Sequence, residues 1–471
     1  MPVPHRPRWL PAIALPALFA VLILAASASG QAPHPNSIFT NHTEFNRDIG
    51  FLFRLILWIG SAVFVFVEGL LIYAIIKFRR KSENDRPEHV HGNTTLEILW
   101  TAIPAVILAV IAVPTVKTIF KTQAVASADA LQVQVIGHQW WWEFRYPQYT
   151  TTNGAKVDTL VTANELYIPL GRKVNFTLTT YDVIHSFWIP QLGGKRDLIS
   201  NRVNHLWFTP DSVGENAWNG FCAEYCGTSH GNMHFKTFTV TPENFQAWTA
   251  HQLTAAVGTV AAAPAAPAAM AVAADTSKAK TVQNPSDAHV PGPATLAVVP
   301  TNTAAGVAKA AAAGSTNAAH DMSTMSMASN GYESYPREKI PAHVVPQTPL
   351  PAGLTFNESL KGDPARGATL ITGVGTCLGC HSIRGNPMMV AQMGPNLTHV
   401  ASRSTIAGGI YPNDAKHLAM WIKNASKMKP GVLMPTLGAG EWDEARKIYA
   451  PKPGLNDQQI ADIVAYLQTL K

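Results

Sequence analysis

Hydrophobic residues are concentrated in long runs near the amino terminus and alternate with polar residues farther along the chain. Two runs, residues 49–78 and 96–120, are apolar almost throughout; the first is interrupted only by Arg54, Glu68 and Lys77. Each run exceeds the roughly twenty apolar residues that a helix needs to cross a bilayer. The pattern predicts two transmembrane helices within a hairpin over residues 41–121.

The segment between the two predicted helices is basic. It carries Lys77, Arg79, Arg80, Lys81 and Arg86. Loops rich in Lys and Arg remain on the cytoplasmic side of a membrane. The hairpin would then return the chain to the outer side, so everything after residue 121 is expected to be extracytoplasmic.

An export signal is predicted over residues 1–30. Basic residues precede an apolar stretch at 10–26, and small residues follow up to Gly30. This order is typical of a signal peptide, with cleavage expected near residues 28–30. A further membrane helix is the alternative, because the apolar region is long.

Apolar and polar residues alternate in short runs over residues 122–252. Examples are LQVQVIG, KVNFTLTT, NHLWFTP and HFKTFTVT, separated by Gly, Pro, Asn and Asp. A period of two is typical of half-buried strands. The segment is therefore expected to form an antiparallel β-sandwich or barrel.

Alanine, proline, serine and threonine dominate residues 253–350, where aromatic residues are nearly absent until Tyr332. This composition predicts a flexible linker. The linker also contains His320, Met322, Met325 and Met327. Transient copper contacts by these side chains are a weaker interpretation than ordinary linker residues.

Residues 351–471 are expected to form a mostly helical last domain. Its final stretch, LNDQQIADIVAYLQTL, has apolar residues at helical spacing, and Asn456 or Asp457 is suited to cap the helix.

The overall composition adds two constraints. The chain has 471 residues and a net charge of +6, yet it lacks the basic runs interleaved with aromatics that nucleic-acid binding would need. Its four cysteines form two close pairs, Cys222/Cys226 and Cys377/Cys380. Close pairs favour local metal or cofactor chemistry over a disulfide scaffold.

The first cysteine pair lies among other soft ligands in FCAEYCGTSHGNM, residues 221–233. Thiolates suit copper, zinc or iron–sulfur, whereas imidazole suits copper and zinc. From this loop alone, copper, zinc and a Cys222–Cys226 disulfide all remain open. His185 in YDVIHSFWIP, otherwise a core residue, adds a second imidazole, and the Met233 thioether favours copper over zinc.

The second pair lies in TCLGCHSI, and C-x-x-C-H is the attachment signature of c-type haem. Both thiols would add to haem vinyl groups, and His381 would bind the iron. A thioredoxin-like redox pair is disfavoured because the βαβ pattern is missing. Methionine is the usual sixth ligand. The candidates are Met388, Met389, Met393, Met420, Met428 and Met434.

DVIHSFWIPQLGGKRD and CAEYCGTSHGNM together resemble subunit II of the haem–copper terminal oxidases, over residues 41 to about 248. The resemblance implies a two-helix hairpin followed by a cupredoxin-like domain with a dinuclear copper centre, CuA. Cys222 and Cys226 would bridge the two coppers. The remaining ligands would be His185 and His230 as terminal imidazoles, with Met233 and the Glu224 carbonyl as weak axial ligands.

The same resemblance implies three further roles. The Glu224 side chain would bind magnesium at the interface with subunit I. Trp140, in GHQWWWEFRYP, would receive electrons from cytochrome c, although three consecutive tryptophans can also simply pack. Glu97, in TTLEILW, would lie at the entrance of a proton path, or would anchor the helix at the membrane interface.

One stretch departs from the family pattern. After GGKRD the family commonly has a Pro-Gly-Arg turn, whereas this chain continues through residues 198–202 as LISNR. The departure leaves the copper ligands intact but puts the local turn, and its contacts with subunit I, in doubt.

GPNLTHVASR and WIKNASKMKPGVLMP resemble the class I cytochrome c domains that are fused to terminal oxidases. In those domains the axial methionine precedes a proline. This singles out Met434, before Pro435, with Met428 in a predicted helix as the alternative. Pro395 resembles the proline that packs near the proximal histidine.

These resemblances predict the electron-input subunit of a caa-type cytochrome c oxidase. The chain would lie in the bacterial inner membrane with subunit I and subunit III. Electrons would come from a bc1 complex or another cytochrome c. The alternatives are the equivalent subunit of a CuA-containing nitric oxide reductase, or a stand-alone membrane-anchored electron-transfer or copper protein.

The two outer domains carry opposite net charges. Residues 123–252 have eight Lys/Arg against ten Asp/Glu, whereas residues 352–471 have twelve Lys/Arg against eight Asp/Glu. Opposite net charges favour docking of the two domains.

Overall fold

The computed structural model describes residues 36–38, 40–80, 82, 91–153, 156–211, 214–256, 332–450 and 453–471. All of them belong to one compact unit. The predicted signal peptide, most of the basic loop and most of the predicted linker lie outside the described residues. The linker histidine and methionines, His320, Met322, Met325 and Met327, lie outside them as well.

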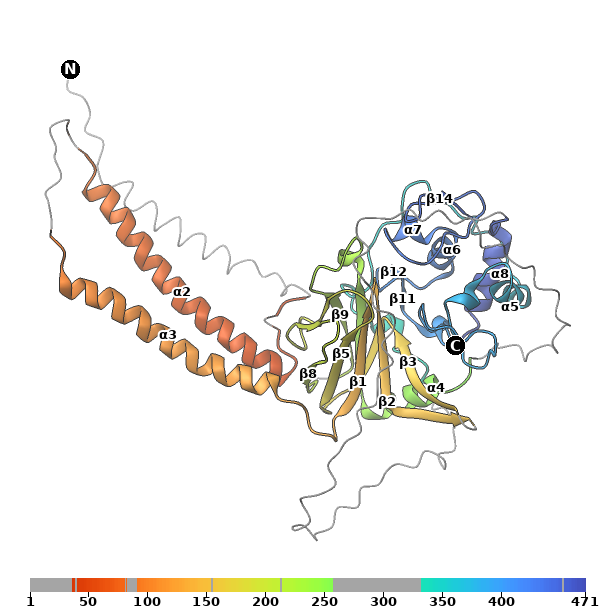
Figure 1. The fold of residues 1–471 in the computed structure, drawn as a ribbon, viewed down its shortest axis with the longest axis horizontal. Coiled ribbons are helices and arrows are strands. Elements are labelled where there is room, and N and C mark those ends of the chain that lie inside the picture. Colours follow the sequence, from red (N-terminus) through yellow and green to blue (C-terminus); the bar gives the residue numbers. More distant parts are fainter. Residues whose placement is uncertain are drawn as a thin grey trace, which may run out of the picture. The chain divides into compact units, whose positions relative to one another are not determined.

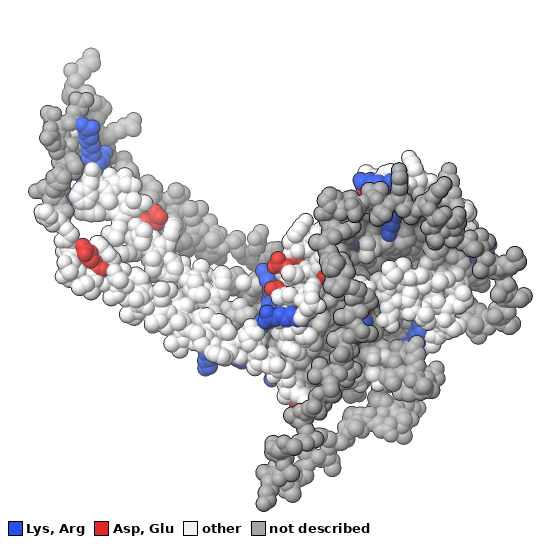
Figure 2. Space-filling view, in the orientation of Figure 1, with Lys and Arg blue, Asp and Glu red and all other residues white. Residues whose placement is uncertain are grey.

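Two long helices, α2 (Glu44–Lys77) and α3 (Thr94–Gln123), form the predicted hairpin (Figure 1). Each begins with a side-chain cap, in which Thr43 and Asn93 accept a backbone N–H of the first turn. Both helices have a mean hydropathy of 2.4 and expose their apolar side chains, as membrane-spanning helices do. Figure 2 shows the hairpin surface as uncharged over most of its length. The prediction of two spans is confirmed.

The start of α2 is bonded to the β domain. Thr43 Oγ1 donates to the Leu192 carbonyl at 2.5 Å, and Asn46 Nδ2 donates to the Pro190 carbonyl at 2.9 Å. Phe45, between them, is 3% exposed. These contacts fix the hairpin to the domain that follows it.

The β domain consists of two five-stranded sheets (Figure 1). The first has the order β3 (Lys156–Ala163), β2 (Trp141–Asn153), β1 (Leu131–His138), β5 (Val174–Thr180) and β8 (Asn204–Phe208). The second has the order β4 (Glu165–Pro169), β10 (His234–Val240), β9 (Asn216–Cys222), β6 (His185–Trp188) and β7 (Arg196–Leu198). The predicted strands and the cupredoxin-like sandwich are confirmed. The sheets are mixed, however, because β1 pairs with β5 and β4 with β10 in parallel.

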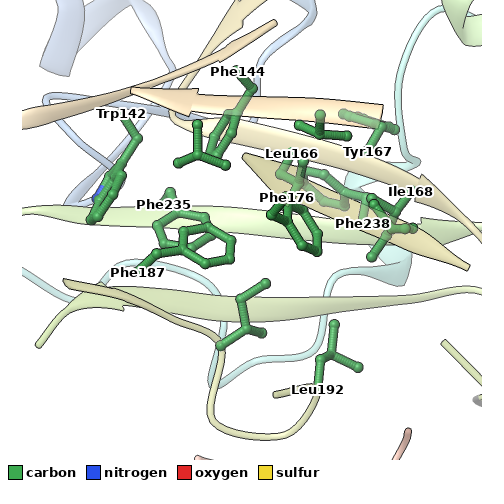
Figure 3. Packing of buried hydrophobic residues seen from close by; sticks show 14 of the residues in the cluster. Trp142, Phe144, Leu166, Tyr167, Ile168, Phe176, Phe187, Leu192, Phe235 and Phe238 are labelled. Atoms are coloured by element: carbon green, nitrogen blue, oxygen red, sulfur yellow. The ribbon is translucent and has the colours of Figure 1, made fainter. Parts of the chain in front are cut away.

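Aromatic side chains fill the space between the sheets (Figure 3). Phe187 from β6 stacks on Phe235 from β10 with ring centroids 5.0 Å apart, and Trp142 from β2 meets Phe235 edge-on at 5.4 Å. All three side chains are fully buried. A buried aromatic side chain contributes about 1.5–3 kcal/mol. This core fixes the strands whose ends carry the candidate ligands.

Helix α4 (Pro242–Gln252) follows β10, and the chain is described again from Tyr332. Residues 332–350, which were expected to belong to the linker, pack against the β domain. Tyr335 and Val344 are buried in its core, and the Tyr335 backbone N–H donates to Tyr167 Oη at 2.9 Å. The aromatic and branched residues that return at this point supply the apolar surface for this packing.

The last domain contains α5 (Pro364–Thr372), α6 (Ala415–Lys423), α7 (Ala425–Met428) and α8 (Asp457–Leu467). Helices α5 and α8 cross so closely that a Cβ at Gly367 would overlap the Asp462 carbonyl. The Arg366 guanidinium also pairs with Asp462 at 2.9 Å. The predicted cap of the last helix is confirmed, since Asn456 and Gln459 form a capping box.

Candidate metal centre

Strand pairing brings the two halves of the predicted copper site together. His185 begins β6, Cys222 ends β9, and these strands are antiparallel neighbours with Phe187 opposite Cys222. The loop after β9 carries Cys226, and the short helix η1 (His230–Asn232) begins with His230. Met233 directly precedes β10. Residues that are far apart in sequence thus meet at one end of the sandwich.

The sulfur and nitrogen atoms are spaced as metal ligands. Cys222 Sγ and Cys226 Sγ are 3.8 Å apart, too far for the bond of about 2 Å in a disulfide, and both cysteines are free. His185 Nδ1 lies 3.8 Å from Cys222 Sγ, and His230 Nδ1 lies 3.6 Å from Cys226 Sγ. The two sulfurs are therefore close enough to bind one metal ion together. The donor set therefore fits soft metal ions.

The two weak ligands predicted for this site lie beside it. Met233 Sδ is 3.8 Å from Cys226 Sγ, and its side chain is fully buried. The carbonyl oxygen of Glu224 is 3.3 Å from Cys222 Sγ, while the Glu224 side chain is exposed. The structure therefore brings together all the residues predicted as copper ligands and leaves the Glu224 carboxylate facing outward.

Protonation of the two thiols is coupled. A hydrogen bond between the sulfurs lowers the pKa of Cys222 to about 3, with further help from His185, even though burial opposes the shift. The same hydrogen bond and burial raise the pKa of Cys226 above its ordinary value, because its neighbour is already an anion. Metal ligands must be deprotonated, so a cation is needed to release the second proton.

An aspartate that the sequence analysis missed orients His185. The His185 Nε2–H donates to Asp182 Oδ1 at 2.9 Å, which leaves Nδ1 to face the sulfurs. Burial opposes protonation of His185, but the hydrogen bonds and negative charges of Asp182 and Cys222 together outweigh it and raise the pKa of His185. The sequence signal that could have indicated this role is the position of the carboxylate, three residues before a candidate ligand histidine.

Trp140 is linked to the site by hydrogen bonds. Trp140 Nε1 and Gln139 Nε2 each donate to the Cys226 carbonyl at 2.9 Å. The Trp140 side chain is 8% exposed and Trp142 is fully buried. Of the three consecutive tryptophans, Trp140 therefore contacts the backbone of a candidate copper ligand, and Trp142 belongs to the aromatic core.

The predicted haem attachment residues lie on η4 (Cys377–Gly379) and just after it. His381 Nδ1 donates to the Pro395 carbonyl at 2.7 Å, which leaves Nε2 available for iron. Burial lowers the pKa of His381, so the ring is neutral as a ligand must be, and burial raises the pKa of Cys377 to about 11. Two thiols and an oriented, neutral imidazole fit a c-type haem.

The candidate sixth ligands differ in burial. Met428, at the end of α7, is 4% exposed and part of the core of this domain, whereas Met434 is half-buried and packs against that core. Met388 and Met393 are exposed. Met389 and Met420 are buried core residues.

Two remaining predicted features lie outside these two sites. Glu97 is in the first turn of α3 and is exposed, and residues 83–90 before it lie outside the described part of the chain. The stretch that departs from the family pattern forms a turn in which Arg202 N–H donates to the Ile199 carbonyl at 3.1 Å. Asn201 has a φ of +60°, and Ser200 Oγ donates to the Asp182 carbonyl.

Comparisons with known families cover three segments of the chain. Residues 41–118 match "Cytochrome C oxidase subunit II, transmembrane domain", and residues 131–240 match "Cytochrome C oxidase subunit II, periplasmic domain". Residues 364–471 match "Cytochrome c".

Individual relatives agree with these matches. A probable cytochrome c oxidase subunit 2 of Rickettsia bellii is 35% identical over 210 residues, which cover 41% of this chain and 76% of the relative. Cytochrome c oxidase subunit 2 of Alkalihalophilus pseudofirmus is 38% identical over 194 residues, which cover 40% of this chain and only 54% of the relative. The periplasmic domain of subunit II of cytochrome oxidase of Bradyrhizobium japonicum is 30% identical, covers 27% of this chain and 94% of that structure, and has a TM-score of 0.22.

Proposed function

We propose, since this chain belongs to the family of cytochrome c oxidase subunit II, that it is the electron-input subunit of a caa-type terminal oxidase. It would accept electrons from a donor at a covalently bound c-type haem and deliver them through CuA to the haem–copper site of subunit I. Oxygen would be reduced to water there, coupled to proton translocation. The fused cytochrome c segment, residues 364–471, supports the caa-type assignment.

The observation that carries the proposal is the ligand cluster joined to Trp140. His185, Cys222, Cys226, His230 and Met233 would hold the copper pair, together with the Glu224 carbonyl. Copper bound by two thiolates supplies one-electron redox chemistry. The residues around it supply rigidity, because the fully buried core below fixes the ligand strands and Asp182 fixes one imidazole.

In the last domain, Cys377 and Cys380 would attach the haem and His381 would bind its iron. Met434 would complete the coordination, since it is the methionine followed by proline. Methionine–histidine ligation raises the reduction potential of a haem.

The remaining roles depend on other subunits. The exposed Glu224 carboxylate would bind magnesium against subunit I, and Trp140 would receive electrons on their way to copper. Glu97 would lie at the proton-path entrance on the cytoplasmic side of a bacterial inner membrane. Subunit III, and a donor such as a bc1 complex or another cytochrome c, would complete the system.

Metal content and spectra of the purified chain test the proposal. We expect about two coppers and one haem per chain, with an electron paramagnetic resonance signal of an electron shared by both coppers. Cys222→Ser should remove that signal and leave the haem spectrum unchanged. Tyr225→Phe, an exposed position in the same loop, is the matched control. Zinc in place of copper would refute the proposal, and nitric oxide consumption without oxygen uptake by the complex would favour the reductase instead.

A further inference from the structure

The haem-binding domain (residues 351–471) contacts the β domain (residues 122–252) at Trp140. Lys429 Nζ donates to the Trp140 carbonyl at 2.6 Å and to the Ala407 carbonyl at 3.0 Å. Gly431 has a φ of +78° and lies on the indole, where an added Cβ would be 2.9 Å from Trp140 Cη2. The loop before Met434 therefore covers the tryptophan that leads to Cys226.

A buried carboxylate of the β domain, that of Glu165, binds the haem-binding domain at a second point. Glu165 is 4% exposed, at the start of β4. One of its carboxylate oxygens accepts three hydrogen bonds, from the Ser404 N–H at 2.7 Å, the Ser404 hydroxyl at 2.6 Å and the Thr405 N–H at 3.2 Å. All three donors belong to the haem-binding domain.

The charges around Glu165 make this contact a strong one. Burial raises the pKa of Glu165, and the hydrogen bonds from Ser404 and the charge of Arg403 across the interface oppose that rise by stabilising the carboxylate. Lys236 attracts the carboxylate from within the β domain. Hydrogen bonds to an ionised group are roughly twice as strong as neutral ones. A buried carboxylate that loses its donors is costly, so the β domain strongly favours the state in which the turn at Ser404 is bound.

We propose that Glu165 is the anchor that holds the haem-binding domain over Trp140, and is thereby a positioning residue for electron transfer from haem to copper. The inference rests on the proposed function for the identity of the two cofactors, and on the hydrogen bonds for the anchor itself. Glu165 touches neither cofactor site. It acts by keeping the loop of Lys429 and Gly431 seated on the indole.

The anchor also determines which electron donors can reach Trp140. With the haem-binding domain seated, Trp140 is only 8% exposed, so a separate cytochrome c has no access to its ring. Electrons from outside must then pass through the haem of this chain. Loss of the anchor would uncover Trp140 and allow a soluble cytochrome c to reduce copper directly.

Glu165→Gln in the full-length chain tests the anchor, with the exposed Glu243→Gln as matched control. Two readouts do not depend on turnover: amide hydrogen exchange at Ser404 and Thr405, and hydroxyl-radical oxidation of Trp140. We expect both to rise about tenfold in Glu165→Gln, the effect of losing roughly one charge-assisted hydrogen bond. Haem-to-copper transfer after flash reduction should slow by a similar factor.

Ser404→Ala carries the same test from the other domain. It removes one hydrogen-bond donor to Glu165 without altering the β domain. Trp140 oxidation in Ser404→Ala therefore tests the anchor even if Glu165→Gln fails to fold. We expect a smaller rise in Trp140 oxidation, and little additional rise when the two substitutions are combined, because both remove one interaction.

The proposal is overturned if Glu165→Gln folds and its rates of amide hydrogen exchange at Ser404 and Thr405, and of Trp140 oxidation, equal those of Glu243→Gln. It is likewise overturned if Glu165→Gln does not fold and Ser404→Ala leaves Trp140 oxidation unchanged. Failure of the proposed function would look different. The purified chain would then lack copper or haem, while the exchange and oxidation readouts would still report the anchor.

Discussion

Replacing Asp182 tests whether the copper ligands are held by the residues around them. Its carboxylate accepts hydrogen bonds from His185 Nε2 at 2.9 Å, the Gln139 N–H at 2.7 Å and the Val183 N–H at 2.7 Å. Asp182→Ala removes all three. It frees the His185 ring to rotate and loosens the residue that precedes Trp140.

The expected magnitude has two parts. Loss of the partner of a metal-bound histidine weakens metal affinity by about 10–100-fold, which corresponds to roughly 1.4–2.8 kcal/mol. Loss of the two hydrogen bonds from the Gln139 and Val183 N–H groups to the charged carboxylate also lowers folding stability. Each bond is worth about 1.5–3 kcal/mol if no water takes the place of the carboxylate. Because Asp182 is a quarter exposed, water recovers part of that second loss.

Copper affinity is measured by competition with a chelator, and folding stability by urea unfolding of the metal-free chain. Asp197→Asn, an exposed aspartate on β7, is the matched control. The reasoning is refuted if Asp182→Ala binds copper as tightly as Asp197→Asn does while its metal-free stability is unchanged.

Three further predictions concern the haem-binding domain. Burial, and then the neighbouring His251 with its ring centroid 4.5 Å away, lower the pKa of His399 to about 4 from an ordinary value of 6.5. The folded chain therefore resists a proton that the unfolded chain accepts, so His399→Gln should reduce the loss of folding stability between pH 7 and pH 5, measured by urea unfolding, by about 2 kcal/mol; a loss equal to that of the unsubstituted chain would contradict the prediction. Met434→Ala should remove the spectrum of a methionine-ligated haem, whereas Met428→Ala should keep it and cost about 2–5 kcal/mol of stability; the reverse pattern would make Met428 the ligand. Gly367→Val should destabilise the α5–α8 contact by about 3 kcal/mol or more in thermal unfolding, and an unchanged melting temperature would contradict the close approach.

Local patterns in the sequence were sufficient for the elements and for the candidate ligands. Alternation of apolar residues located strands such as β1 and β5, and the capping signal located the start of α8. Short ligand spacings identified Cys222, Cys226 and His230 together, because a metal loop is encoded within a few residues. The sequence offered His185 only as a second imidazole on the β domain, and the family resemblance assigned it to the same centre, because β6 and β9 are joined through long-range pairing.

The remaining features depend on contacts between distant segments. Alternation indicates which residues face inward but carries no information about strand order, so the parallel pairing of β1 with β5 was not predicted. Glu165 and Ser404 are 239 positions apart, and neither belongs to a recognisable motif. Tyr335 follows a long alanine- and proline-rich stretch, which concealed that it packs into the β domain.

Flash reduction of the haem in the purified full-length chain tests the central claim most directly. Absorbance is followed at the haem band and at the copper band after a light-driven donor reduces the haem. We predict that the haem is reoxidised as copper is reduced, with a rate independent of protein concentration, because donor and acceptor belong to one chain. A haem that stays reduced beside oxidised copper, or a rate that rises in proportion to protein concentration, would contradict the account.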